Sequence, residues 1–475
     1  MSMLAHVFYY EWLSFIRNKF QIVMLLLVFL LGSYSIFYGC SEIAKQKKAI
    51  VSVHQQDKQE RARIQQGFKA DTTTADGKRL WQLAAVTRFV WHRQFYAAVF
   101  PPSALSALSL GQRDIQTYYY KLTAMSIYYQ LFQNEIANPQ KLLIGNFDLS
   151  FVFVYLFPLL IIAFCYSLLS ADKDRGLLAL LKSQAAPVHR IIIYRLLFYF
   201  LIIFALALLL SFAGFAASGI RPGPDLRNII AWLAVVTAYL VFWFAILFII
   251  IALNKNSSFN AMAGMGAWLT FLIIIPAVLN ILISVAMPLN TSVLSGISRR
   301  TGVFDEENDE NQKKVIREYL KQRPELDFGS KTYKSDLITK GFAAYTELND
   351  QKSAEMVRRY QNQVQVREGL ARHIDFINPA VNAQNMFDAI AGSDLQSFQQ
   401  FYHAVKNFHA QLVSFYYPKL FADNNLTQND FSKAPQFRFM QASADRTSIF
   451  PGILWLAGIS LISILWSFKM LKKDL

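Results

Sequence analysis

The stretch LSFVFVYLFPLLIIAFCYSLLS, residues 149 to 170, decides the fold class of this chain. It is apolar throughout and contains no Asp, Glu, Lys, Arg or His. A helix needs roughly 20 such residues to cross a hydrocarbon core of about 30 Å. The stretch therefore predicts a membrane-spanning helix, in which Pro158 indicates a tolerated kink.

Five further stretches have a similar length and the same lack of charge. They are Phe20 to Gly39, Leu196 to Gly219, Asn228 to Leu253, Phe259 to Leu289 and Ile449 to Phe468. Hydrophobic residues make up 54% of the chain and charged residues only 17%, a composition typical of polytopic membrane proteins. The sequence thus predicts an all-α membrane protein with six transmembrane helices.

The spans are arranged as one, four and one, and a long polar segment fills each of the two gaps. The predicted division is 1–39 with the first span, 40–148, 149–289 with spans two to five, 290–448, and 449–475 with the last span. Because four spans separate the two polar segments, both must emerge on the same side of the membrane. Each is longer than many independent domains, so we expect two extracytoplasmic domains.

Helical patterns dominate the polar segments. Residues 41–70 lack proline and predict a helix that continues the first span out of the membrane. In the second segment, helices are expected at 308–322, at 351–376 and from Ser393 onward. Ser393 and Gln396 have the spacing of a capping box, in which two side chains satisfy free backbone donors of the first helical turn. Neither segment shows the sustained alternation of a sheet.

The net charge of +15 is mainly an orientation signal. Residues 290–448 are nearly neutral, with 20 basic and 19 acidic side chains, so a nucleic-acid partner, the other reading of a basic chain, is not expected. Basic residues instead cluster beside the spans on one side, which the positive-inside rule makes cytoplasmic. They are Arg17, Lys19, Lys173, Arg175, Lys182, Arg190, Arg195, Lys255, Lys469, Lys472 and Lys473.

Two cysteines occur in the chain, Cys40 and Cys165, so no disulfide framework is expected. Phe37-Tyr38-Gly39-Cys40 has a small residue before cysteine, as lipoprotein signals do. Tyr38 is too bulky for that cleavage site, and the preceding apolar stretch is as long as a true span. We therefore expect an uncleaved signal anchor, with cleavage as the alternative.

The sequence shows no evident catalytic, metal or cofactor site. Residues 329–332 lack the second glycine and the spacing of a nucleotide-binding loop, so no nucleotide or other cofactor site is expected on this chain. His403 and His409 are interpreted as surface or packing residues. No span supplies a nucleophile and base, which argues against an intramembrane hydrolase. Nor does any span offer the ionisable group that an ion-coupled carrier needs, so any transport must draw energy from another subunit.

The cytoplasmic loop DKDRGLLALLKSQAAPVHR, residues 172–190, is where such energy could enter. Leu177, Leu180 and Leu181 fall on one helical face, and Pro187 closes the segment. On spacing alone this is a short helix at the membrane surface, without a partner of its own.

The loop also resembles the pattern after the second span of ABC-2 type permeases. The matching residues are Asp172, Lys173, Asp174, Arg175, Gly176, Leu177 at the place of the usual Thr, Leu180 in the Leu-rich turn, and Pro187. The resemblance implies a coupling helix within 171–190 that fits a cleft in a separate ATPase subunit. Asp in place of the usual Glu, and Leu177 in place of Thr, leave the docking detail open.

The N-terminus carries a second likeness, because it resembles the amphipathic elbow helix that precedes the first span in the same family. The residues are Glu11, Trp12, Arg17 and Lys19. An ordinary aromatic and basic interface anchor is the alternative.

Two outer motifs resemble those of a bacterial subgroup of these permeases whose outer loops carry a domain of unknown function. The first runs from Pro101 to Ser106, with Gly111 and Asp114, and continues at 145–148. The second is Asn378-Pro379-Ala380 with Gly392, Ser393 and Asp394. Proline and glycine at these places could also serve only to shape turns.

The resemblance implies an exporter in the bacterial inner membrane with both termini in the cytoplasm. Two permease subunits, identical or related, would pair with two ATPase subunits that hold ATP and Mg²⁺. The large outer domains would gate the exit, bind cargo or receive a periplasmic partner. The alternative is a mechanotransmission complex, in which the ATPase moves the outer domains without translocating cargo.

Overall fold

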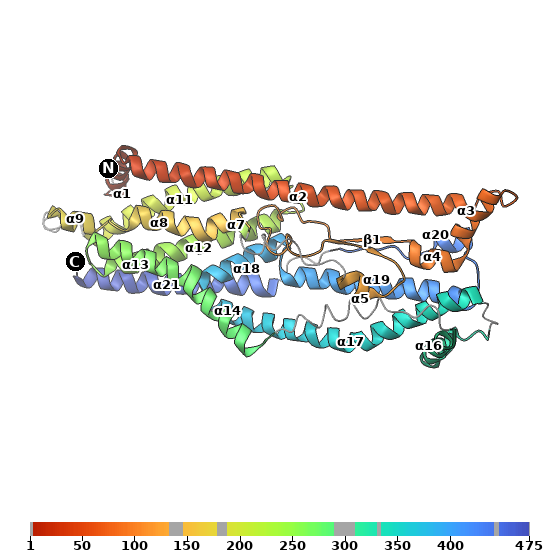
Figure 1. Cartoon of the computed structure of the whole chain (residues 1–475). Helices are drawn as coiled ribbons and strands as arrows, with labels where there is room; N and C mark the ends of the chain where they lie inside the picture. Colours follow the sequence, from red (N-terminus) through yellow and green to blue (C-terminus); the bar gives the residue numbers. More distant parts are fainter. Residues whose placement is uncertain are drawn as a thin grey trace.

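The computed structural model describes residues 3–132, 146–177, 188–288, 309–329, 334–440 and 446–474. These residues form a long, mainly helical body (Figure 1). The two termini lie at one end, here called the terminal end. The two long polar segments contribute most of the other end, here called the distal layer (Figure 1).

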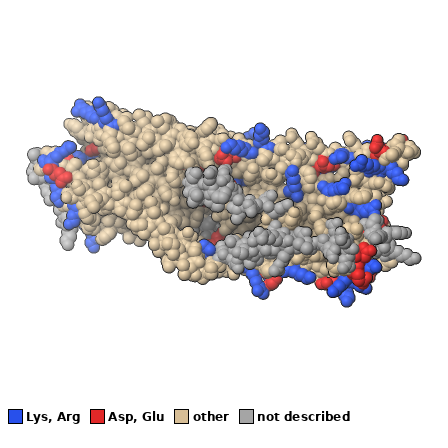
Figure 2. Space-filling view, viewed as in Figure 1, with Lys and Arg blue, Asp and Glu red and all other residues tan. Residues whose placement is uncertain are grey.

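Among the described residues, six helices are long and apolar enough to cross a membrane, which supports a multi-pass membrane protein. They are α2 (Lys19–Gly67), the run Leu149–Asp174, α11 (Val188–Ser218), α12 (Leu226–Ala252), the run Ser257–Ala286, and Ile449–Lys472 within α21 (Arg446–Asp474). In the space-filling view a broad band without Lys, Arg, Asp or Glu separates the charged terminal end from the charged distal layer (Figure 2).

The second and fifth spans each contain a π-helical turn just before a proline. The second comprises α7 (Leu149–Phe151), η1 (Val152–Leu156), α8 (Phe157–Cys165) and α9 (Ser170–Asp174); the fifth comprises α13 (Ser257–Leu269), η2 (Thr270–Ile274) and α14 (Ile275–Ala286). Proline has no N–H and clashes with the carbonyl four residues earlier, so the helix widens there.

Side chains from other elements bind the carbonyls of these turns. The Tyr239 hydroxyl donates to the carbonyl of Val154, 2.9 Å away, which is the carbonyl four residues before Pro158. The Asn378 amide donates to the carbonyl of Phe271, at 2.6 Å. Freed backbone groups at membrane depth need such partners, so Pro158 has the structural role that the sequence indicated, and Pro276 of the fifth span has the same role.

Helix α2 extends far beyond its membrane span. Its 49 residues, at 1.5 Å each, give roughly 74 Å, and Figure 1 shows it running along nearly the whole molecule. The expected continuation of the first span is thus present, and it ends at Gly67. Gly39 lies inside it, beside the carbonyl of Ala107, which would be 1.8 Å from an added Cβ. Close packing therefore explains the small residue before Cys40.

The distal layer combines elements of both long segments. The first gives α3 (Ala75–Ala85), α4 (Thr87–Arg93), β1 (Tyr96–Val99), β2 (Tyr119–Leu122) and α5 (Ile127–Phe132). The second gives α16 (Asp309–Gln322), η3 (Pro324–Leu326), α17 (Lys334–Asp375), α19 (Leu395–Phe421) and α20 (Gln428–Ser432). The strands pair antiparallel, Tyr96 with Leu122, and are too short to show an alternating pattern in the sequence.

One hydrophobic core holds the distal layer together. It joins Trp91, Tyr96 and Tyr120 of the first segment to Phe401 and Tyr416 of the second. The Tyr96 and Tyr416 hydroxyls lie 2.6 Å apart, and the rings of Tyr120 and Phe401 stack. The segments expected as two domains therefore fold as one body, because the apolar faces of each are buried by the other.

Two helix starts differ from the sequence expectation. Helix α17 begins at Lys334 rather than near 351. Helix α19 begins at Leu395 with Asp394 at its N-cap, so the predicted capping box of Ser393 and Gln396 is wrong. The Ser393 hydroxyl instead donates to the carbonyl of Ser109, 2.8 Å away, because a distant loop lies closer to it than the first turn of its own helix.

Helix α18 (Pro379–Ala391) belongs to the second long segment but packs among the ends of the spans (Figure 1). Phe387 is fully buried between Phe153 and Trp232. On the other side, Met386 lies against Gly452 of α21, where an added Cβ would come 2.7 Å from its sulfur. Thus α18 closes the core of the spans on the side of the distal layer.

Candidate functional site

The N-terminal helix α1 (Met3–Arg17) is separate from the first span. Asn18 interrupts it with an extended backbone, and its side chain accepts from the N–H of Gln21 to cap α2, which starts at Lys19. Trp12 is half exposed, whereas Glu11 beside it is buried. The helix therefore buries one side against the protein and exposes another.

Arg195 joins the N-terminal helix to the loop after the second span. Its Nε lies 2.8 Å from the Glu11 carboxylate, and its Nη1 donates to Asp172 Oδ2 at 2.6 Å. The same nitrogen donates to the carbonyl of Leu168, 2.9 Å away. One guanidinium near the start of α11 thus ties together α1, α9 and the turn that precedes α9.

Burial raises the pKa of Glu11, and the charge of Arg195 opposes that rise. Removing the guanidinium would leave Glu11 and Asp172 as neighbouring carboxylates in a poorly hydrated site. The free-energy cost of removing Arg195 is therefore larger than the net stabilisation that the ion pair contributes.

The other face of α9 is held by the turn between α12 and α13. Lys173 donates to the carbonyl of Asn254, 2.7 Å away, and the Ser257 hydroxyl donates to Asp174 at 2.7 Å. Asn254 has a φ of 52°, a left-handed conformation that asparagine tolerates better than most residues. The base of the loop therefore touches the fourth and fifth spans as well.

The three described residues that follow this base are exposed to solvent. Arg175, Gly176 and Leu177 are exposed, and Leu177 keeps 43% of its surface open. Gly176 ends α9 with a φ of 74°, which L side chains rarely adopt. Leu180 and Pro187 of the predicted coupling helix lie outside the described residues.

The sequence does not identify the residues that fix this base. In it Arg195 is one of several basic residues beside the spans, and Asn254 and Ser257 belong to no recognisable motif. A basic residue one position before an apolar stretch is the one signal that could have pointed to Arg195.

The two outer motifs converge at the junction between the spans and the distal layer. The Ser109 hydroxyl donates to Asp388 at 2.5 Å and lies 3.0 Å from the Ser150 hydroxyl, which donates to Asp148 at 2.6 Å. The Gln384 amide donates to both Ser150 and Asp388. A buried polar chain therefore runs from the first outer loop through the start of the second span to α18.

Glycines allow the loops at this junction to approach closely. Gly111 has a φ of 50°, and an added Cβ would lie 2.7 Å from the carbonyl of Ser393. Gly392 ends α18 with a φ of 63°. The Ser103 and Ser106 hydroxyls donate to the carbonyl of Ala391. The motif residues thus have a packing role, which holds whether or not cargo passes here.

Two carboxylates are buried side by side in this chain of contacts. Burial raises the pKa of Asp388 to about 7; the Ser109 hydrogen bond lowers it and the nearby Asp148 raises it. Burial also raises the pKa of Asp148, although Ser150, Phe151 and Leu110 donate hydrogen bonds to it. The junction therefore favours the protonated form of Asp388 below neutral pH.

The described residues contain no cluster of three or more His, Cys, Asp or Glu side chains that could hold a metal ion. His409 is buried and its ring nitrogen bonds the carbonyl of Met125, while His403 is exposed. The first is a packing histidine and the second a surface histidine, as expected.

Comparison with known proteins gives one match. A family described as Domain of unknown function (DUF3526) matches residues 292–440, which contain α16 to α20. No curated protein and no solved structure matches the chain.

Proposed function

We propose that this chain is the membrane subunit of an ATP-driven exporter of the ABC-2 type, energised by a separate ATPase. The observation that carries the proposal is the loop after the second span. Its last described residues, Arg175 to Leu177, are exposed, while its base is bonded to α11 and to the α12–α13 turn, and through Arg195 to α1. A force applied to these exposed residues would reach the three elements through short polar contacts.

In this mechanism ATP and Mg²⁺ reside on the ATPase, which receives residues 172–187 in a cleft. Closure of two ATPase subunits would press this segment against Arg195 and Ser257. The second, third and fifth spans would then shift together, because the contacts at the base hold them as one unit. Cargo would leave between two copies of this chain, identical or related.

The proposed setting is the bacterial inner membrane, with both termini and residues 172–190 in the cytoplasm. The basic residues beside the spans at the terminal end support this orientation. The distal layer would then lie outside, where it could gate the exit or receive a periplasmic partner.

A second function is favoured by one observation, the unbroken helix α2. A single helix of 49 residues links the membrane bundle to the far end of the distal layer. Such a strut could transmit motion to the cell envelope with no cargo crossing the membrane. Purified complex in vesicles separates the two functions, because a pure transmitter hydrolyses ATP and moves no solute or lipid between compartments.

The coupling proposal is tested with a tagged full-length chain and its ATPase. We expect the wild type to co-purify with a subunit that carries a nucleotide-binding loop and to stimulate its ATP hydrolysis. Asp174→Lys together with Arg175→Glu should remove both effects, because both charges lie within the proposed docking segment. Arg221→Glu, on the exposed turn at the other end of the spans, is the matched control.

Equal association and equal hydrolysis in both variants would refute docking at this segment. Both sets of substitutions lie at exposed positions, so both variants should fold. A separate measurement of folding checks this for each variant.

A further inference from the structure

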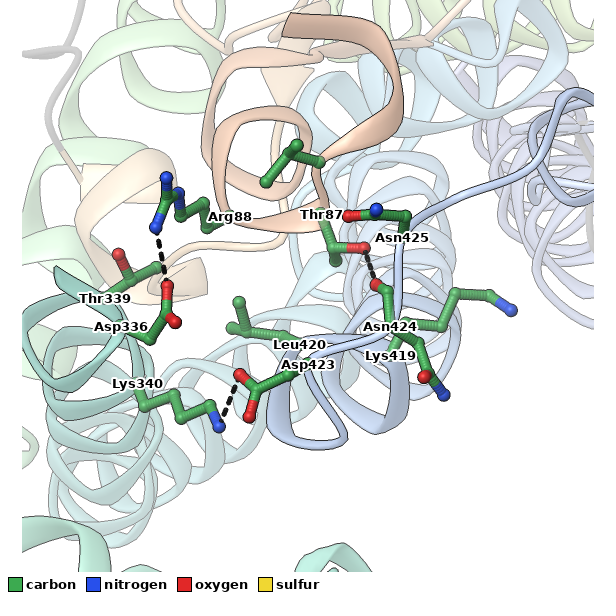
Figure 3. Close-up of a pocket in the computed structure, with 11 residues that line it drawn as sticks. Thr87, Arg88, Asp336, Thr339, Lys340, Lys419, Leu420, Asp423, Asn424 and Asn425 are labelled. Carbon is green, nitrogen blue, oxygen red and sulfur yellow. Dashed lines mark hydrogen bonds and ion pairs between the residues drawn. The ribbon is translucent and has the colours of Figure 1, made fainter. Parts of the chain in front are cut away.

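A small cavity lies at the tip of the distal layer, far from the spans. Its walls are the start of α4, the first turns of α17, and the C-terminal end of α19 with the loop that follows (Figure 3). Its volume is about 190 Å³. That corresponds to roughly six water molecules at about 30 Å³ each, and is below the roughly 300 Å³ at which drug-sized pockets begin.

Charged side chains of both signs line this cavity. Arg88 of α4 bonds Asp336 of α17 at 2.7 Å, and Lys340 bonds Asp423 at 2.7 Å (Figure 3). Lys419 also lines the wall and bonds Asp430, 3.1 Å away, just outside it. The Lys419 ammonium therefore points away from the cavity, which is faced by two cations and two carboxylates and is strongly polar but balanced in charge (Figure 3).

Lys340 is the buried anchor of the site. Its side chain is 4% exposed, and its amine also donates to the carbonyl of Phe421, 3.1 Å away. An ammonium this deeply buried needs charged or dipolar partners around it. Asp423 supplies one, and it does so from a backbone position where aspartate is uncommon.

Asp423 follows the end of α19 with a φ of 56°. The N–H of Asn424 bonds the carbonyl of Lys419, 2.9 Å away, which is the pattern of a helix end that usually has glycine at the left-handed position. Aspartate costs stability there, and its carboxylate faces Lys340 in the cavity (Figure 3). Departures from local preference of this kind concentrate at ligand sites.

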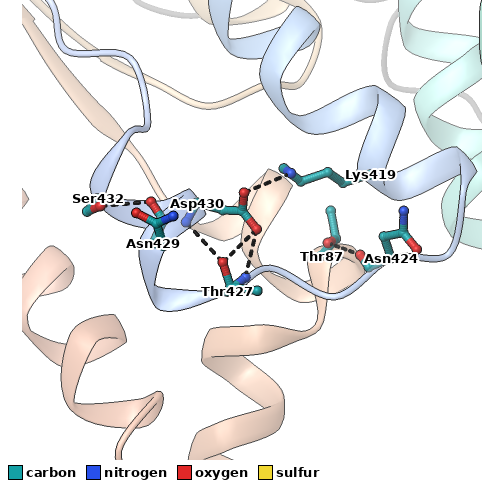
Figure 4. A network of polar contacts seen from close by, with 7 residues as sticks. All are labelled: Thr87, Lys419, Asn424, Thr427, Asn429, Asp430 and Ser432. Carbon is teal, nitrogen blue, oxygen red and sulfur yellow. Dashed lines mark hydrogen bonds and ion pairs between the residues drawn. The ribbon is translucent and has the colours of Figure 1, made fainter.

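The loop behind the cavity is held rigidly. The Thr87 hydroxyl donates to the carbonyl of Asn424 at 2.6 Å, and the N–H of Leu426 bonds the carbonyl of Ala85 at 2.7 Å. Thr427 and Asp430 form a capping box at the start of α20, and Asp430 also accepts from Lys419 (Figure 4). The site is therefore preformed, which lowers the entropic cost of binding.

We propose that this cavity binds a compact zwitterion of the size of a free amino acid. A ligand ammonium would meet Asp336 and Asp423, each of which bonds its cation through one carboxylate oxygen. A ligand carboxylate would meet Arg88, and Thr339 adds a hydroxyl in the wall. A simple anion would also face the two carboxylates, and a simple cation would also face the two basic groups.

Titration calorimetry on the full-length protein in detergent tests the proposal. The probes are the common amino acids, with acetate, methylammonium and glucose as comparison compounds, each at up to about 10 mM. We expect at least one amino acid to bind, and acetate and methylammonium to bind at least about tenfold more weakly, since each makes half of the charged contacts.

Variants locate the site. Arg88→Gln and Asp336→Asn should each raise the dissociation constant by about tenfold or more. Arg359→Gln and Glu355→Gln are the matched controls, because they break an exposed ion pair on the same helix α17 outside the cavity. These controls should bind like the wild type.

Three results overturn the proposal: no amino acid binds, glucose or a singly charged probe binds as tightly, or the cavity variants bind like the controls. Thermal unfolding without ligand shows whether each variant is folded. If Asp336→Asn unfolds, Thr339→Val serves in its place, since it changes the wall without removing a charge.

Discussion

The guanidinium of Arg195 reaches Asp172 Oδ2 at 2.6 Å and the Glu11 carboxylate at 2.8 Å. Arg195 and Glu11 are far apart in the sequence. The Arg195 side chain thus contacts both the N-terminal helix and the loop after the second span, at the end where the ATPase is proposed to dock.

Arg195→Met should destabilise the contacts among the N-terminal helix, α9 and α11, and should weaken coupling to the proposed ATPase. Two partly buried carboxylates would lose their shared cation, at a cost of about 2 kcal/mol in the free energy of unfolding. We expect a lower midpoint of thermal unfolding and weaker stimulation of the ATPase. Arg190→Met on the same helix removes an exposed charge and should change neither quantity. A normal midpoint in Arg195→Met would contradict the structural role of the pair.

Stability should fall as the pH rises through neutrality, in part because of Asp388. The folded protein holds the pKa of this carboxyl at about 7, above its ordinary value of 3.8. The stability tied to its proton is therefore complete below about pH 4 and is lost as the pH approaches and passes 7.

Asp388→Asn mimics the protonated carboxyl, because its amide oxygen can still accept from Ser109. The variant should lose less stability than the wild type between pH 5 and 8, as measured by thermal unfolding. Burial also raises the pKa of Asp350 to about 7, so the Asp388→Asn variant should retain part of the dependence of stability on pH. Glu310→Gln, at an exposed position, should retain the full wild-type slope; an equal slope in Asp388→Asn would refute the assignment.

Gly39→Ala should lower the stability of the fold strongly, although it adds only one methyl group. The added Cβ would lie 1.8 Å from the carbonyl of Ala107, and neither backbone can move freely. Overpacking of this kind costs about 1–3 kcal/mol. Gly266→Ala in the fifth span meets no atom within 4 Å and should leave the unfolding midpoint nearly unchanged. Similar midpoints for the two variants would argue against the close approach of α2 and the 101–111 loop.

The proposed orientation can be read from thiol labelling in intact cells. Cys165 is fully buried, so a Cys40→Ser background leaves no readily accessible thiol among the described residues. A membrane-impermeant maleimide should label Arg221→Cys in intact cells and Arg175→Cys only after the membrane is opened. Labelling of Arg175→Cys from outside would reverse the topology.

The spans were readable from the sequence because membrane insertion depends on the hydropathy of consecutive residues. The helix that continues the first span was readable for another reason, because residues 41–70 contain no proline. Boundaries were less certain: Lys334 to Gln351 carries no strong start signal, and α17 begins there because its apolar side chains find α16 and α19.

The outer motifs show the limit of reasoning from local pattern. In the sequence the motif pieces are separate, and turn formation is their simplest explanation; they are residues 101–106, residues 145–148, Asn378-Pro379-Ala380, and Gly392 to Asp394. The structure brings them to one junction through the contacts of Ser109 with Ser150 and Asp388. Ser393 was mistaken for a helix cap because its true partner, the carbonyl of Ser109, lies 284 residues away in the chain.

By itself, the sequence determined that this is a helical membrane protein with six spans and two long polar segments, since these features are sums over neighbouring residues. Only the tertiary structure decided that the polar segments share one core, that Arg195 holds Glu11 and Asp172, and that Arg88, Asp336, Lys340 and Asp423 surround one cavity. The physical reason is that burial and charge pairing depend on which distant surfaces meet, and that choice is made by the packing of the whole chain.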